Sequence, residues 1–304
     1  MPIVLGVLIR AVPAPLGLAG HNNGGAESLL LILVIAACFT GAANAVRELV
    51  KERAIYSRER AAGLSAGAYL ASKLIILGLI SSLQACVLVL IGLAGVKLPH
   101  RGTVLVHLPL VELLAAIGLL AITSMTLGLL ISAVVNTSEK TMPLLVVSVM
   151  FQVILTGGVF SLAGKAGLEQ VAWLSPSRWG FAATASTVNL NVIQPGGTVT
   201  VPAKAAAAGA SGGHAAGKGQ AAGTSARRTA GHLGHGAGQP RAETSPSAAP
   251  AAAGSASSAV QPDPLWKHTA KTWLFDMAMM VVLGLAFTLI SWWRLVRLSP
   301  GRRK

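Results

Sequence analysis

Charge and aromatic side chains are scarce in this chain of 304 residues. Only 11% of its residues are charged and 5% are aromatic, whereas 53% are hydrophobic. Charged residues make up about 25% of a typical soluble domain, so the composition excludes an ordinary soluble fold. The net charge of +14 does not indicate nucleic-acid binding, because the Lys and Arg residues lie between long apolar runs and not on one face of a soluble domain.

Cysteine is also rare. Cys38 and Cys86 each lie inside an apolar run, where a free cysteine acts as a small buried hydrophobic side chain. The sequence therefore predicts no disulfide framework.

What the chain has in abundance is long apolar runs. A membrane-spanning helix needs about 20 mainly apolar residues, and we predict such helices at 28–46, 66–96, 110–135, 143–162 and 273–293. Residues 1–20 are apolar but contain Arg10 and three prolines. A secretory signal peptide is disfavoured there because no basic residue precedes the apolar stretch. We predict the back half of a first spanning helix whose front half is missing.

The distribution of basic residues predicts the orientation. Twelve Lys and Arg residues lie on one side of the predicted spans, in the segments 47–73 and 294–304 and at Lys140. The short loop on the other side has only Lys97 and Arg101. The positive-inside rule therefore places the first set, with the C-terminal tail 294–304, in the cytoplasm. We expect an all-α multi-pass protein of the plasma membrane with about six spanning helices.

Residues 195–262 are mainly Ala, Gly, Ser, Thr and Pro. Such a segment buries too little apolar area to offset the entropy of ordering, so we predict a disordered external loop. Its His232 and His235 lack rigid partners, and we predict no metal site. The stretch GGHAAGKG at 212–219 ends in Gly, whereas a phosphate-binding P-loop ends in Ser or Thr. We therefore predict no nucleotide site in this chain.

Residues 46–62 carry the densest charge in the chain. Val46, Leu49, Val50 and Ala54 fall on one face of a helix, which predicts an amphipathic helix at the cytoplasmic interface. Gly63 ends the pattern, and Ser65 is placed to cap the next helix. Two interpretations remain open: a charged loop that only fixes topology, or a stiff lever on which a cytoplasmic motor acts.

Polar residues inside the predicted spans are few. Glu27, Glu112 and Asp276, like Arg10, lie within a turn or two of the outer interface, where a charge is tolerated. A proton-coupled secondary transporter would be expected to carry paired acids at mid-membrane, so their absence disfavours that class. Asn44, Gln84 and Gln152 lie deeper and either line a path or bond neighbouring helices.

Three stretches resemble the type-2 ABC exporter membrane domain of the G (white) subfamily. The stretch RELVKERAIYSRERAAGLSAGAYLASK resembles the connecting helix of that domain. The stretch NTSEKTMPL, which begins at Asn136, resembles its short inner loop, and WLSPSRWGF resembles part of its external re-entrant segment, here at 163–194. The chain is most similar to actinobacterial fusions with forkhead-associated and ATPase domains. The matching residues of the connecting helix are Glu52, Arg53, Tyr56, Arg58, Glu59 and Arg60, and those of the re-entrant segment are Trp173, Ser175, Pro176, Arg178 and Trp179.

The resemblance implies the permease domain of an ATP-driven exporter, working as a homodimer in the lipid bilayer. The first set of residues would couple it to an ABC ATPase domain, fused upstream or on a separate chain, which would bind the ATP and magnesium. The chain would then be no enzyme by itself. The alternatives are a non-transporting membrane scaffold and, with less support, a secondary transporter.

Overall fold

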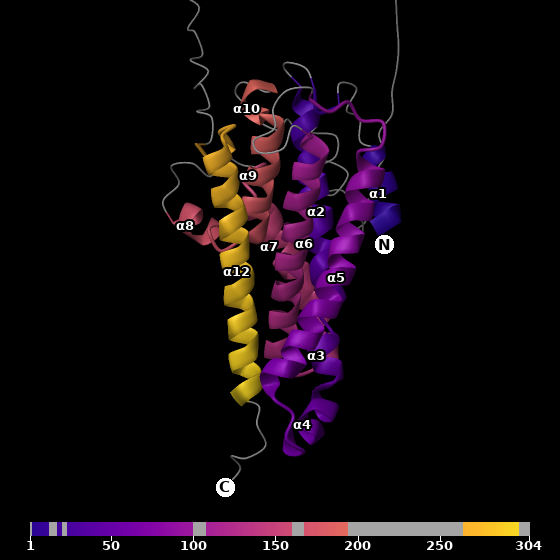
Figure 1. Cartoon of the computed structure of the whole chain (residues 1–304), viewed down its shortest axis with the longest axis vertical. Helices are drawn as coiled ribbons and strands as arrows, with labels where there is room; N and C mark the ends of the chain where they lie inside the picture. Colours follow the sequence, from indigo (N-terminus) through magenta and orange to yellow (C-terminus); the bar gives the residue numbers. More distant parts are fainter. Residues whose placement is uncertain are drawn as a thin grey trace, which may run out of the picture. The chain divides into compact units, whose positions relative to one another are not determined.

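The computed structural model describes residues 2–11, 17–19, 23–99, 108–159, 167–193 and 264–297. Within these ranges every regular element is a helix (Figure 1), which confirms the all-α prediction. The predicted external loop at 195–262, its histidines and the last residues of the basic tail lie outside the described residues.

Among the described residues, five helices are long and apolar enough to cross a membrane. They are α2 (Gly24–Ala45), which continues almost directly into α3 (Glu48–Lys51), α5 (Ala66–Gly92), α6 (Pro109–Val134), α7 (Thr141–Leu155) preceded by a 3-10 turn at Ser138–Lys140, and α12 (Ala270–Arg297). The first segment forms only the nine-residue helix α1 (Pro2–Arg10), which packs on the last turns of α5 through Gly6 and Ile9. It is too short to span by itself.

Local signals account for several helix ends. The Ser65 hydroxyl accepts a hydrogen bond from the backbone N–H of Ala68 at 3.1 Å, which confirms it as the cap of α5. Gly63 has a φ of +107°, a conformation that favours glycine. The apolar run that begins at 143 ends its helix early, at Leu155, because Gly157 turns the chain with a φ of +85°.

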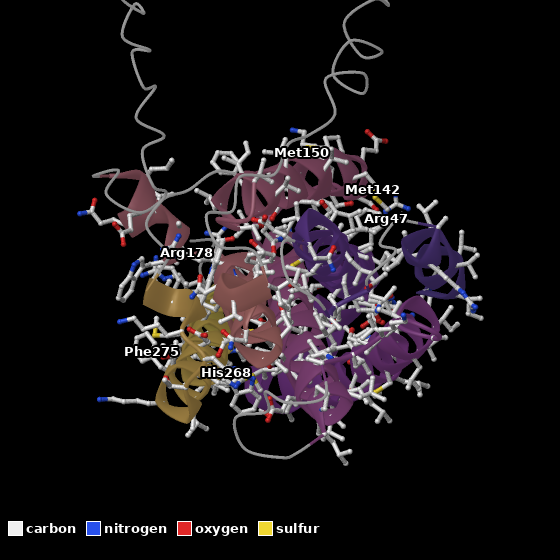
Figure 2. All side chains as sticks on the ribbon, turned by 90° about the horizontal axis from the view of Figure 1, so that it is seen from above. Arg47, Met142, Met150, Arg178, His268 and Phe275 are labelled. Carbon is white, nitrogen blue, oxygen red and sulfur yellow. The ribbon has the colours of Figure 1, made fainter. Side chains whose placement is uncertain are left out.

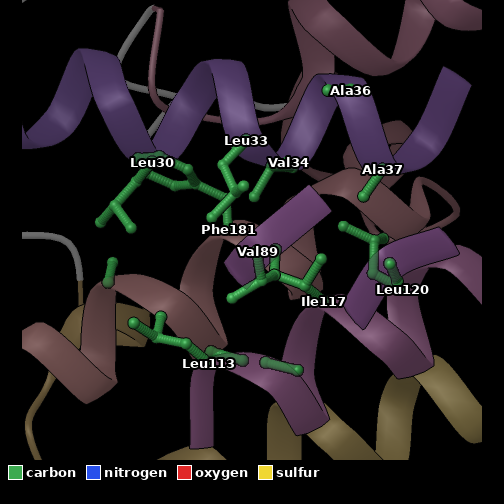
Figure 3. Packing of buried hydrophobic residues seen from close by; sticks show 14 of the residues in the cluster. Leu30, Leu33, Val34, Ala36, Ala37, Val89, Leu113, Ile117, Leu120 and Phe181 are labelled. Atoms are coloured by element: carbon green, nitrogen blue, oxygen red, sulfur yellow. The ribbon is translucent and has the colours of Figure 1, made fainter. Parts of the chain in front are cut away.

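Helix α6 lies at the centre of the bundle and packs against α2, α5, α12 and α9 (Pro176–Val188). Its crossing with α2 is close: a Cβ on Gly41 would lie 2.3 Å from the carbonyl oxygen of Ala121, and one on Gly128 would lie 2.4 Å from that of Ala42. Small residues allow membrane helices to approach in this way. Figure 3 shows the apolar core beside this crossing, to which Leu30, Leu113, Ile117 and Phe181 belong.

The two ends of the bundle differ in charge. The end that holds α3, α4 (Arg53–Ala61), the 3-10 turn and the last turn of α12 contains Arg47, Lys51, Arg53, Arg58, Arg60, Lys73, Lys140, Arg294 and Arg297 (Figure 1). We call it the basic end. Glu27, Glu112 and Asp276 lie near the opposite end, as predicted, but the three side chains are buried and do not face water. Helix packing around the first turns of α2, α6 and α12 covers them.

Candidate functional site

The charged segment after α2, residues 46–62, is here called the connecting segment. The sequence predicted one helix, but the structure has two, α3 and α4, separated by Glu52 with φ −94° and ψ 5°. The break changes the phase of the apolar face. Val46 and Leu49 are buried as predicted, whereas Ala54 is exposed and Tyr56 is buried in its place.

Helix α5 holds the connecting segment through an ionic cluster. The Lys73 ammonium donates to Glu48 Oε1 at 2.7 Å and to Glu52 Oε1 at 2.6 Å. The Tyr69 hydroxyl donates to Glu52 Oε2 at 2.8 Å. One cation and one hydroxyl on α5 therefore fix both carboxylates, and the break at Glu52 turns its side chain toward them.

Helix α6 is bound by Arg53. Its Nη1 donates to Asn136 Oδ1 at 2.9 Å, and its Nη2 donates to the carbonyl oxygens of Val135 at 2.9 Å and Ala133 at 3.2 Å. These carbonyls end α6, and a cation stabilises such a C-terminus. The backbone N–H of Val50 adds a hydrogen bond to Ser132 Oγ at 3.0 Å.

Helix α12 is contacted by Tyr56. The side chain is 3% exposed, and its hydroxyl donates to the carbonyl oxygen of Leu295 at 3.4 Å. Its ring lies 4.8 Å from that of Tyr69, centroid to centroid. Glu52, Arg53 and Tyr56 together tie the connecting segment to α5, α6 and α12.

Two of the other three residues of the predicted coupling set face outward. Arg58 and Glu59 are exposed, and Arg60 is half-buried. Ile55, on the same helix, is 49% exposed. Glu52, Arg53 and Tyr56 therefore form an inner face that anchors the connecting segment, whereas Arg58 and Glu59 form an exposed outer face.

The inner face is electrostatically matched. Burial raises the pKa of Glu52, but the hydrogen bonds from Lys73 and Tyr69 and the charge of Lys73 outweigh it, so the pKa of this carboxyl lies below its ordinary value of 4.5. The carboxylate is the form that both donors require. The Glu52 side chain is therefore ionised at neutral pH.

The predicted re-entrant residues gather around α8 (Leu168–Ala172) and α9 (Pro176–Val188). Pro176 begins α9, every residue of which is buried. The Trp179 indole N–H donates to the carbonyl oxygen of Trp173 at 2.9 Å, and the Ser177 hydroxyl donates to the carbonyl oxygen of Gln152 on α7 at 2.7 Å. Helix α9 therefore starts against the last turn of α7 inside the bundle. Its far end lies against residues 267 and 268, before α12.

The three deeper polar residues do not form one site. Asn44 Nδ2 donates to Gln84 Oε1 at 2.6 Å and to Ser81 Oγ at 3.2 Å, which links α2 to α5. This contact agrees with helix packing for Asn44 and Gln84. Gln152 lies on a different helix, is 4% exposed, and its amide has no hydrogen-bond partner among the described residues.

Sequence reasoning missed Lys73, Ser132 and Asn136 as partners of the connecting segment. Lys73 was counted only as a topology signal. A charge placed two turns inside an apolar run is costly unless it is paired, and two acids precede it at 48 and 52. A lysine inside an apolar run that follows two acids therefore indicates an ion pair between them.

The described bundle and its charged end define a multi-pass membrane protein. The family model for the ABC-2 type transporter matches residues 1–188, and the chain belongs to that family. It is the membrane-spanning permease part of an ABC transporter. It is 30% identical, over 300 residues, to an ABC transporter ATP-binding/permease protein of Mycobacterium tuberculosis; the match covers 97% of this chain and 28% of that relative. The chain thus spans less than a third of the relative's length.

Proposed function

We propose that this permease domain belongs to an ATP-driven exporter and that its connecting segment receives the motion of a cytoplasmic ATPase domain. One observation carries the proposal: the segment is tied to α5, α6 and α12 by its inner face, while Arg58 and Glu59 on its outer face are exposed. A partner that displaced α4 would displace three spanning helices. The ATP-binding part in the relative's name supports such a partner, fused or separate, which would hold ATP and magnesium.

The anchoring contacts favour a lever over a charged loop that only fixes topology. A topology signal needs only positive charge near the membrane. It does not need a guanidinium directed at three acceptors on α6, or two carboxylates held by one ammonium. The non-transporting scaffold likewise has no use for these ties.

The orientation follows from the same segment. The basic end would face the cytoplasm of a bacterial cell, and the last turn of α12, with Arg294 and Arg297, would lie on that side of the inner membrane. In this orientation the start of α9, Ser175–Arg178, here called the foot of α9, would lie within the external re-entrant segment 163–194.

In this proposal the translocation path lies between two copies of the chain. Helix α7 packs through one face, and the opposite face exposes Val146, Val147, Met150, Phe151 and Ile154. An apolar face of this kind is suited to lipid or to another helix. The mass of the detergent-solubilised complex distinguishes a homodimer from a monomer.

The experiment co-expresses the chain with its ATPase domain and measures ATP turnover. Replacing both Arg58 and Glu59 with Ala keeps the net charge and leaves the anchoring contacts in place, so the bundle should keep its melting temperature while ATP turnover changes severalfold. Lys271→Ala, at an exposed position at the opposite end, is the control and should change neither quantity. Unchanged turnover in the double variant would favour the scaffold.

Labelling tests the orientation separately. Arg58→Cys should react with a membrane-impermeant maleimide only from the cytoplasmic side. The native Cys38 is buried and Cys86 is half-buried, both within spanning helices, so each gives little background. Labelling of position 58 from the outside would overturn the assignment.

A further inference from the structure

A buried guanidinium lies at the foot of α9 without a full set of partners. The Arg178 side chain is 3% exposed, and its Nε and Nη1 have no hydrogen-bond partner among the described residues. Its Nη2 lies 4.0 Å from Glu169 Oε1, at the limit of an ion pair, and the Glu169 side chain is 44% exposed. An ion buried with so little compensation is strongly unfavourable unless a further group neutralises it.

The backbone adds positive potential at the same place. Arg178 is in the first turn of the thirteen-residue helix α9, and Ser175, the residue before the helix, makes no side-chain cap hydrogen bond. The first N–H groups of a helix attract anions. Because helical side chains tilt toward the N-terminus, the guanidinium leans toward this same end.

The site lies beside α7 and α12, two of the candidate membrane-spanning helices, and away from the basic end. Ser177, next to Arg178, binds the carbonyl oxygen of Gln152, which lies about 16 Å along α7 from its start at Thr141 by the rise of an α-helix. Gln152 itself is buried with a free amide. Figure 2 shows Arg178 where α8, α9 and α12 come together, near Phe275, whose ring stacks edge-on against Trp179.

We propose that the foot of α9 binds an oxyanion, either the phosphate of an anionic lipid headgroup or a free phosphate, through Arg178. Nη2 shares one edge of the guanidinium with Nε and the other with Nη1, so an oxyanion bound in the fork geometry at either edge would compete with Glu169 for Nη2. Arg178 lies in the first turn of α9, which has no side-chain cap, and the neighbouring Ser177 is bonded to the backbone of Gln152, whose amide has no partner within the described ranges. Glu169, on the more exposed side, is a weak competitor for the same guanidinium. This site does not depend on the coupling proposal, since ligand retention requires no ATPase.

The test uses the full chain in nanodiscs of phosphatidylglycerol and phosphatidylcholine in equal amounts, and native mass spectrometry counts the retained lipids. The wild type should retain phosphatidylglycerol preferentially, and Arg178→Gln should weaken that retention at least about tenfold, because the charge and at least one charge-assisted hydrogen bond are lost. Arg178→Lys should recover part of it, since the charge stays but the fork is lost. Lys271→Gln, which removes an exposed charge near the same end, should match the wild type.

Glu169→Gln should change lipid retention in the opposite direction, and it replaces a residue whose side chain is already partly exposed. Removing the competing carboxylate should raise retention about twofold, the range of a single exposed ion pair. Displacement of the lipid by millimolar inorganic phosphate would identify the free oxyanion as sufficient, and resistance would identify the lipid headgroup; both support the site. Equal retention in the wild type and Arg178→Gln, or a loss of retention in Glu169→Gln, would overturn it.

Discussion

Arg53 is the strongest single tie between the connecting segment and the bundle, so replacing it gives the sharpest test. In Arg53→Ala the side chain loses three hydrogen bonds, to Asn136, Val135 and Ala133. A hydrogen bond that involves a charged group contributes about 1.5–3 kcal/mol when its partner stays buried. The guanidinium is only part-buried, and the end of α6 partly regains water. We therefore expect a total loss of about 3 kcal/mol.

That loss should be visible in thermal unfolding of the detergent-solubilised chain. For a chain of this size, 1 kcal/mol shifts the melting temperature by about 2–4 °C, so Arg53→Ala should lower it by about 6–12 °C. Arg53→Lys keeps the charge at the end of α6 but cannot reach all three acceptors from one ammonium. The melting temperature of Arg53→Lys should therefore fall by about half as much as that of Arg53→Ala.

Arg58→Ala is the matched control. It removes the same residue type from the same helix α4, at an exposed position, where a substitution changes the free energy of unfolding by about 0.5 kcal/mol or less. Similar melting temperatures for Arg53→Ala and Arg58→Ala would refute the anchoring argument. If Arg58→Ala alters ATP turnover of the complex without altering stability, the two faces of the connecting segment are separated as proposed.

Three further predictions test the packing. Glu52 has a lowered pKa, so its contribution is complete above about pH 4.5 and is lost as the pH falls through the folded-state pKa; the melting temperature of Glu52→Gln should therefore decrease less than that of the wild type between pH 6 and 3.5. Gly128→Ala should destabilise by about 1–3 kcal/mol because the new methyl meets the backbone of Ala42, whereas Gly118→Ala in the same helix, with nothing within 4 Å, should be neutral or stabilising by about 1 kcal/mol; urea unfolding compares them. Tyr56→Phe should lose about 1 kcal/mol with its hydroxyl bond to α12, read by the same assay.

The helices themselves could be predicted from sequence because the bilayer leaves the backbone few choices. Every peptide group in the membrane must be satisfied within its own segment, so a long apolar run becomes a helix. The helix ends at Gly63 and Ser65 could also be predicted, because each depends only on local backbone geometry. The break at Glu52 was not, since it depends on Tyr69 and Lys73, which follow it by 17 and 21 residues.

The arrangement of the helices could not be predicted, and α5 and α6 show why. The mean hydropathy of α5 is 2.7 and that of α6 is 2.3, yet 33% of the apolar window of α5 is buried against 67% for α6. The more apolar helix is therefore the less buried one. Lipid and protein interior are similarly apolar, so periodicity that marks a buried face in water carries little information here.

The packing of the helices indicates how a displacement of α4 would be transmitted through the bundle. The connecting segment holds the end of α6 through Arg53. Helix α6 contacts α2 backbone to backbone at Gly41 and Gly128, where no flexible side chain lies between the two helices. These two helices should therefore move as one body. Helix α7 is packed along one face only, with Thr141, Leu145, Val149, Gln152 and Leu155 buried. Movement driven through the connecting segment is thus expected where α7 meets the α2–α6 pair, beside the foot of α9.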